Sequence, residues 1–165
     1  MSSLSIRQVE ETARAFRQQG ILHCFTGHVA VNYWGYHRAF SELDILISPN
    51  PLSLPRINQA LAILGLPNGI TDTLLGNPII RISDGLVFVD LYTQTNDGRF
   101  LSREMIRWVS FGSDIIPVMR LEPLLAHLQG AGDQYPEEEY ADAIKRIMEL
   151  LRLEHRPLNP RHFLA

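Results

Sequence analysis

Apolar residues recur at helical and at strand-like spacings in alternation along the chain. Between residues 6 and 16 they are separated by three and four positions, which predicts a helix over residues 5–19 with Gly20 as its stop. The run "ILHCF" that follows predicts a short strand, and "HVAVNYW" after Gly27 predicts a helix. This part of the chain is therefore expected to fold as helix, strand, glycine turn and helix.

The middle of the chain predicts three strands and one helix. Residues 43–47 form the next expected strand, which ends at "SPNP", and "SLPRINQALAILG" then has helical spacing. The segments "PIIRIS" and "LVFVDLYT" flank Asp84 and Gly85, a dipeptide typical of tight hairpins. These two segments are expected to pair as antiparallel strands.

The last third of the chain is mainly helical in its pattern. "SREMIRWV" predicts a helix, "DIIPVM" a strand, and "LEPLLAHL" and "PEEEYADAIKRIMELLRL" two further helices. We therefore expect a single α+β domain over residues 1–165, with a mixed, mostly antiparallel sheet of about five strands flanked by helices. Its C-terminal segment is expected to be helical over residues 121–153 and irregular over residues 154–165.

Composition narrows the classes of function. The chain has 165 residues and a formal net charge of −3, and Lys145 is the only lysine among its 15 basic residues. It therefore lacks the diffuse positive charge with which proteins bind nucleic acid regardless of sequence, and an acidic ligand must be held locally. Cys24 is the only cysteine, which excludes an intramolecular disulfide and a multi-cysteine zinc site.

The sequence carries no sign of secretion or membrane insertion. Glu10 and Glu11 stand where a secretory signal would be apolar. No stretch approaches the ~20 consecutive apolar residues that a membrane span requires. We expect a cytoplasmic protein that does not associate with a membrane.

Three carboxylates lie in or beside predicted strands. Glu42 and Asp44 are two positions apart, so both project from the same face of a strand. Asp90 lies inside the apolar segment "GLVFVDLYT", where a buried carboxylate requires a partner. Converging carboxylates repel one another unless a divalent cation binds between them. The pattern indicates a metal site, and the alternative is a set of solvated strand ends that lie far apart.

The glycine turn is a second candidate element. Gly27 has no Cβ, so the backbone there can approach a ligand closely. A helix that begins at His28 would direct free N–H groups and the positive end of its dipole toward a phosphate. The alternative is a tight connection that binds nothing.

A resemblance to the nucleotidyltransferase superfamily, which has the polymerase-beta-type fold, rests on the segments "TGHVAVNYWGYHRAFSELDILIS" and "VFVDLYT". The closest likeness is to its small bacterial branch of minimal and toxin–antitoxin nucleotidyltransferases. The segment "DIIPVMRLEPLLAHL" is similar to a later strand and helix of that branch, so the resemblance covers residues 20 to about 150.

The resemblance implies both a reaction and its residues. It implies that the catalytic residues and metal ligands are Glu42, Asp44 and Asp90. It implies that the nucleotide-binding residues are Gly27, His28 and Arg38, although Arg38 could instead form a structural ion pair. The family transfers a nucleoside monophosphate from an NTP to an acceptor hydroxyl, using two Mg²⁺ or Mn²⁺ ions roughly 4 Å apart. The acceptor stays open among an antibiotic hydroxyl, an RNA 3′ end and a protein side chain.

The sequence departs from the family pattern at three places. Thr26-Gly27-His28 stands where Gly-Gly or Gly-Ser is usual, and Glu42 stands where an aspartate is usual. The segment "LEPLLAHLQGAGD" lacks a lysine that relatives often carry, and His127 is either its substitute or a packed residue. Two functions therefore remain open: an active metal-dependent enzyme, or a catalytically inactive nucleotide-binding or toxin–antitoxin regulatory protein with a partner protein.

Overall fold

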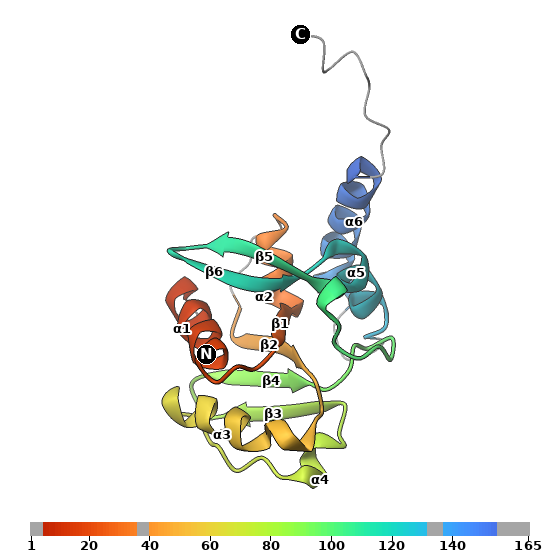
Figure 1. Ribbon diagram of the computed structural model, residues 1–165. Helices are drawn as coiled ribbons and strands as arrows, with labels where there is room; N and C mark the ends of the chain where they lie inside the picture. The colour runs from red at the N-terminus through yellow and green to blue at the C-terminus, as the bar shows by residue number, and fades with distance from the viewer. Residues whose placement is uncertain (1–4, 36–39, 132–136, 155–165) are drawn as a thin grey trace.

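A six-stranded sheet forms the centre of the computed structural model, which describes residues 5–35, 40–131 and 137–154, with backbone alone over 137–140 (Figure 1). In spatial order the strands are β3 (Ile79–Ser83), β4 (Phe88–Tyr92), β2 (Glu42–Ile47), β1 (His23–Thr26), β6 (Asp114–Met119) and β5 (Ile106–Phe111). Neighbours are antiparallel in the pairs β3–β4, β1–β2 and β5–β6, and parallel in β2–β4 and β1–β6. The expected mixed, mostly antiparallel sheet is confirmed.

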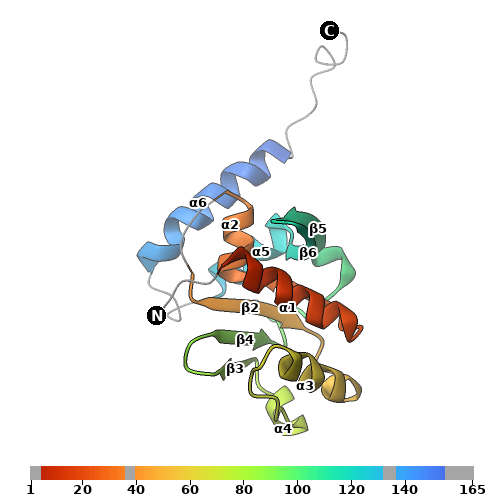
Figure 2. The same ribbon diagram turned by 90° about the vertical axis from the view of Figure 1, so that its left-hand side faces the viewer.

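Helices cover both faces of this sheet (Figure 2). They are α1 (Ile6–Gln18), α2 (Gly27–Tyr33), α3 (Leu54–Ile63), α4 (Asp72–Leu75), α5 (Leu121–Gln129) and α6 (Glu137–Glu154). Helices α1 and α3 pack together on one face, where the Phe16 ring lies 5.0 Å from the ring of His23 in β1. On the other face α2 contacts β1, β2 and β6, and α5 packs His127 against Tyr92 of β4.

Helix α1 begins where its sequence predicts. Ser5 and Gln8 form a capping box that satisfies free N–H groups of the first turn. Val9, Ala13 and Phe16 of its apolar stripe are fully buried against the sheet, whereas Ile6 in the first turn is exposed. The buried Glu10 carboxylate accepts hydrogen bonds from the backbone N–H (2.5 Å) and hydroxyl (3.1 Å) of Ser113, which fastens α1 to the β5–β6 turn.

The predicted helix over "SREMIRWV" is wrong. Residues Arg103–Met105 form a short 3₁₀ helix, η2, and Ile106–Phe111 form strand β5, the sixth strand of the sheet. The buried side chains of this segment are those of Met105, Ile106 and Val109, and their spacing of three and four imitates a helical stripe. Because β5 is an edge strand that pairs only with β6, tertiary pairing decides its conformation.

Two short helical segments were not predicted from the sequence, and the predicted tail is not described. Helix α4 and the 3₁₀ helix η1 (Pro51–Ser53) were not predicted, because four- and three-residue turns carry no apolar periodicity. The predicted irregular tail lies outside the described residues from residue 155 onward. None of the helices in the described ranges is both long enough and apolar enough to span a bilayer.

Candidate functional site

The carboxylates of Glu42, Asp44 and Asp90 converge on one face of the sheet. Strands β2 and β4 are parallel neighbours, and their register places Asp44 beside Asp90 and Glu42 beside Phe88. One carboxylate oxygen from each acid lies within 4.8 Å of the others. The alternative of three separated, solvated strand ends is therefore wrong, since Asp44 is 0% and Asp90 3% exposed.

Asp44 is the most constrained of the three acids. Neither of its carboxylate oxygens has a hydrogen-bond partner within the described part of the chain. Burial raises its pKa well above the usual value, and the charges of Asp90 and Glu42 raise it further. The nearby backbone N–H of His28 and the Arg81 guanidinium oppose that rise in pKa without cancelling it. A cation bound at these oxygens would supply the partner that the surrounding protein does not.

Arg81 on β3 is the residue that sequence reasoning missed. Its Nε and Nη2 donate to the two carboxylate oxygens of Asp90, both at 2.9 Å, and Nη2 also donates to Glu42 Oε1 at 3.3 Å. The bonds to Asp90 raise the pKa of Arg81 further above its usual value. The signal was present in the predicted hairpin, because pairing Ser83 with Phe88 sets Arg81 opposite Asp90.

Gly27 begins α2 directly against the carboxylate of Asp44. Its φ of 53° lies in the left-handed region, and a Cβ built at this position would overlap Asp44 Oδ2. The glycine therefore lets Asp44 approach the first turn of α2. His28, the next residue, is half-buried in that turn. Both residues thus lie beside the carboxylates, and their phosphate-binding role stays a prediction.

Other predicted residues have different outcomes. Arg38 lies outside the described residues, so its nucleotide-binding role stays a prediction. His127 is 1% exposed, its Nδ1 accepts a hydrogen bond from the Asn96 backbone N–H at 3.0 Å, and its ring packs on Tyr92. It is a packed core residue, and it does not substitute for the missing lysine.

The donor set suits a hard divalent cation. Three carboxylates offer oxygen ligands of the kind that Mg²⁺ and Mn²⁺ prefer. The unpartnered, fully buried oxygens of Asp44 belong to this donor set. The residues present therefore fit the metal that the resemblance implies.

Comparison with solved structures bears on this arrangement. The lincomycin-bound lincosamide antibiotic adenylyltransferase LnuA is similar over 89% of this chain and 98% of its own, with 12% identity and a TM-score of 0.64. ANT(2″)-Ia in complex with adenylyl-2″-tobramycin is similar over 88% of each chain, with 8% identity and a TM-score of 0.62. TM1012 of Thermotoga maritima, described as a putative nucleotidyltransferase, is 12% identical and is similar over 87% of this chain and 92% of its own, with a TM-score of 0.57.

The chain has the nucleotidyltransferase fold. No protein-family model and no curated protein sequence matches it. The fold expected from the two motif segments is therefore confirmed by structure, at identities too low to transfer an activity. What this nucleotidyltransferase fold contributes is the placement of the acids, since β2 and β4 carry all three.

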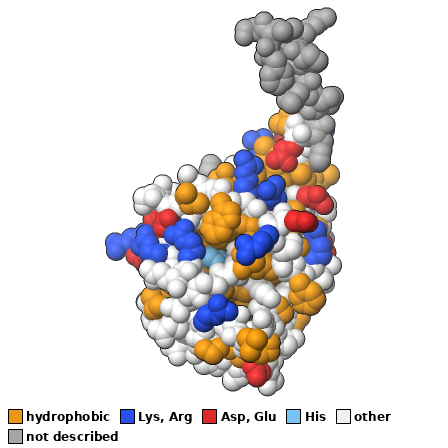
Figure 3. All heavy atoms as spheres, in the orientation of Figure 1, with side chains coloured by type: hydrophobic (Ala, Val, Ile, Leu, Met, Phe, Trp, Pro, Cys, Tyr) orange, Lys and Arg blue, Asp and Glu red, His pale blue; other side chains and the backbone are white. Residues whose placement is uncertain are grey.

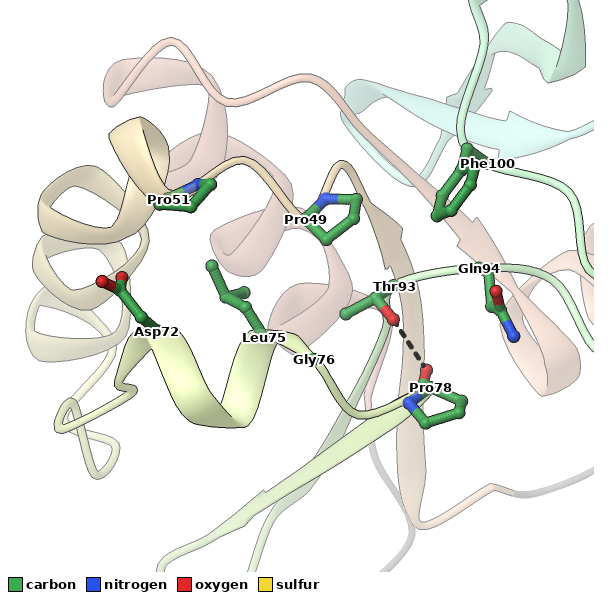
Figure 4. Close-up of a pocket in the computed structure, with 9 residues that line it drawn as sticks. All are labelled: Pro49, Pro51, Asp72, Leu75, Gly76, Pro78, Thr93, Gln94 and Phe100. Carbon is green, nitrogen blue, oxygen red and sulfur yellow. Dashed lines mark hydrogen bonds between the residues drawn. The ribbon is translucent and has the colours of Figure 1, made fainter.

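A cavity of about 430 Å³ opens at the carboxyl ends of β2 and β4 (Figure 4). Pro49, Pro78 and Phe100 are among its walls, and Asp72 lies at its edge. Glu42, Asp44, Asp90, Gly27 and His28, the predicted site residues that the structure describes, do not line it. This cavity is therefore separate from the carboxylate cluster.

Proposed function

We propose that the protein transfers a nucleoside monophosphate from an NTP to an acceptor hydroxyl, with pyrophosphate as the leaving group. The observation that carries this proposal is the convergence of Glu42, Asp44 and Asp90 beside the Gly27 turn, on a nucleotidyltransferase fold. The similar structures support the reaction class, because LnuA is named as an adenylyltransferase and ANT(2″)-Ia is in complex with an adenylylated antibiotic.

Each residue has a role that its surroundings support. Glu42 and Asp44 would hold a divalent cation, Mg²⁺ or Mn²⁺, which when bound neutralises phosphate charge and lowers the pKa of the attacking hydroxyl. Asp90, on the neighbouring strand, would be the third ligand of the metal site, and it would also orient that hydroxyl and accept its proton as general base. The first turn of α2 at Gly27 and His28 would hold the triphosphate, and Arg38 would bind a phosphate oxygen.

A small hydroxyl-bearing molecule is the acceptor that we propose. LnuA is described with lincomycin and ANT(2″)-Ia with adenylyl-2″-tobramycin, both small antibiotic-derived ligands. On the face shown in Figure 3, basic side chains are scattered among hydrophobic and uncharged ones and form no continuous cationic surface. A long RNA acceptor would require such a surface.

The test is release of pyrophosphate together with the mass of the acceptor. The protein is incubated with Mg²⁺, each of four NTPs and a panel of hydroxyl-bearing antibiotics. The mass of each antibiotic is then measured by mass spectrometry. We expect the mass of one added nucleoside monophosphate, lost in Asp44→Asn and Asp90→Asn and kept in Asp142→Asn, an exposed carboxylate on α6. Unchanged transfer in Asp44→Asn or Asp90→Asn would overturn the site assignment.

A second candidate is a catalytically inactive nucleotide-binding protein, including one member of a toxin–antitoxin pair that acts through a partner protein. Two observations favour it: Arg81 engages Asp90 and Glu42, and Leu121–Gln129 contains no lysine. This candidate predicts NTP binding in direct titration without release of pyrophosphate. Release of pyrophosphate excludes it.

A further inference from the structure

We propose that Arg81 is a built-in counter-cation of the carboxylate cluster, and that its guanidinium must leave Asp90 before a divalent cation binds there. This inference rests on the proposed metal site of Glu42, Asp44 and Asp90. It assigns to Arg81 a positioning and gating role that precedes nucleotide transfer.

The first argument is the occupancy of the Asp90 oxygens. Nε and Nη2 of Arg81 bind one oxygen each at 2.9 Å, a forked arrangement that fixes the plane of the carboxylate. The same Nη2 reaches Glu42 at 3.3 Å, so one guanidinium joins the two acids that flank Asp44. A carboxylate oxygen that accepts a hydrogen bond from Arg81 is less available as a metal ligand. Arg81 and a cation at Asp90 therefore compete.

The second argument is that Arg81 can leave at low cost. Its side chain is 56% exposed, whereas that of Asp90 is 5% exposed. Strand β3 is an edge strand that pairs only with β4, so the space on its outer side is not closed by another strand. The guanidinium already lies 5.6 Å from the centre of the Phe88 ring, which can retain the cation after its bonds to Asp90 break. Rotation of one exposed side chain, with no change in the core, would free Asp90.

The third argument is the charge balance of the cluster. Three acids with oxygens within 4.8 Å repel one another, and Arg81 is the described cation that bonds to any of them. Its removal leaves a buried Asp90 carboxylate without a counter-charge, which destabilises the metal-free fold. The same removal leaves all the oxygen ligands in place and free of a competing cation, so their affinity for a divalent cation rises. Loss of Arg81 should therefore lower the stability of the metal-free protein and raise its affinity for the metal. A purely structural ion pair would lower the stability without raising the metal affinity.

The test measures Mn²⁺ binding from the electron paramagnetic resonance signal of free Mn²⁺, so that no activity is needed. We expect Arg81→Met to bind Mn²⁺ about tenfold more tightly than the original chain, a gain of about 1.4 kcal/mol. Without metal, the same variant is expected to melt at a lower temperature, and saturating Mn²⁺ is expected to raise its melting temperature more than it raises that of the original chain.

The matched control is Arg107→Met. Arg107 lies on β5, the other edge strand, and its guanidinium stacks on the Trp34 ring at 5.4 Å without contacting the three acids. We expect unchanged Mn²⁺ affinity for this control. Arg81→Lys keeps the positive charge but loses the forked contact, and its affinity is expected between those of the original chain and Arg81→Met. If Arg81→Met does not fold, the Mn²⁺ affinity of Arg81→Lys is compared with that of the original chain instead.

The outcomes separate this inference from the proposed function. If the original chain binds Mn²⁺ through Asp44, as shown by loss of binding in Asp44→Asn, but the Arg81 variants bind equally or more weakly, this inference alone is overturned. If neither the original chain nor any Arg81 variant binds Mn²⁺, the metal site of the proposed function fails with it. Binding that appears or strengthens only in the Arg81 variants supports the gating role.

Discussion

The carboxylate of Asp44 lies against the backbone of Gly27, in the space that a Cβ atom of residue 27 would occupy. This contact joins the middle of β2 to the first turn of α2. Since Gly27 also has a φ of 53°, both the space and the backbone conformation require glycine. The geometry of the carboxylate cluster therefore depends on a residue that has no side chain.

Replacing Gly27 by alanine is expected to destabilise the protein and displace Asp44. We expect the free energy of unfolding to fall by roughly 3 kcal/mol, from backbone strain and from the overlap with Asp44. Urea denaturation measures this loss. Gly65→Ala is the control, because Gly65 has a similar φ of 71° but no atom within 4 Å of its Cβ position. Its loss is expected to be roughly 1 kcal/mol, and equal losses in the two variants would contradict the account.

Asparagine at position 44 is expected to separate stability from binding. It matches aspartate in shape but removes a fully buried carboxylate that lacks hydrogen-bond partners in the described structure. We therefore expect the free energy of unfolding of Asp44→Asn at pH 7 to rise by roughly 1 kcal/mol, so that the variant unfolds at a higher denaturant concentration. We also expect it to lose Mn²⁺ binding. The exposed control Asp142→Asn should change neither property. A destabilised Asp44→Asn variant would show that the charge of Asp44 is compensated in the metal-free protein.

Acid is expected to destabilise the fold through two buried histidines. Burial lowers the pKa of both His23 and His127 to about 4, from the usual 6.5. Between these pH values the unfolded chain binds more protons than the native protein, so stability present above pH 6.5 is lost as the pH falls toward 4. From pH 7 to pH 5 the expected loss is about 2 kcal/mol per histidine.

Urea denaturation of His23→Gln at the same two pH values tests this assignment. In the native protein the His23 Nδ1–H donates to the Ile21 carbonyl at 3.0 Å, a bond that the neutral ring makes. The variant lacks the contribution of His23, so its loss of stability between pH 7 and pH 5 should be smaller than that of the original chain by about 2 kcal/mol. A dependence as steep as that of the original chain would assign it to other groups.

The sequence predicted the carboxylate face because strand geometry is local. Alternation places Glu42 and Asp44 on one side of any strand, and an apolar setting marks Asp90 as buried. The meeting of β2 with β4 was not encoded in either segment alone. It was implied by the resemblance to a known family, and the structure supplies the register that aligns Asp44 with Asp90.

Residues that depend on tertiary pairing were harder to predict. Arg81 faces Asp90 only because the hairpin register fixes it there, and one residue of slippage would turn it to the opposite face. Strand β5 was predicted as a helix, because its buried residues are spaced as in a helix and do not alternate as in a strand. His127 is buried by packing against Tyr92, which lies 35 positions earlier in the sequence.

The most direct test of the central claim is a crystal structure of the protein with Mn²⁺ and a non-hydrolysable NTP analogue, with Mn²⁺ located by anomalous scattering. We predict an anomalous peak coordinated by Glu42, Asp44 and Asp90, with the triphosphate against the first turn of α2 and the Arg81 guanidinium turned away from Asp90. A peak at other residues, or a triphosphate bound away from these carboxylates, would contradict the claim.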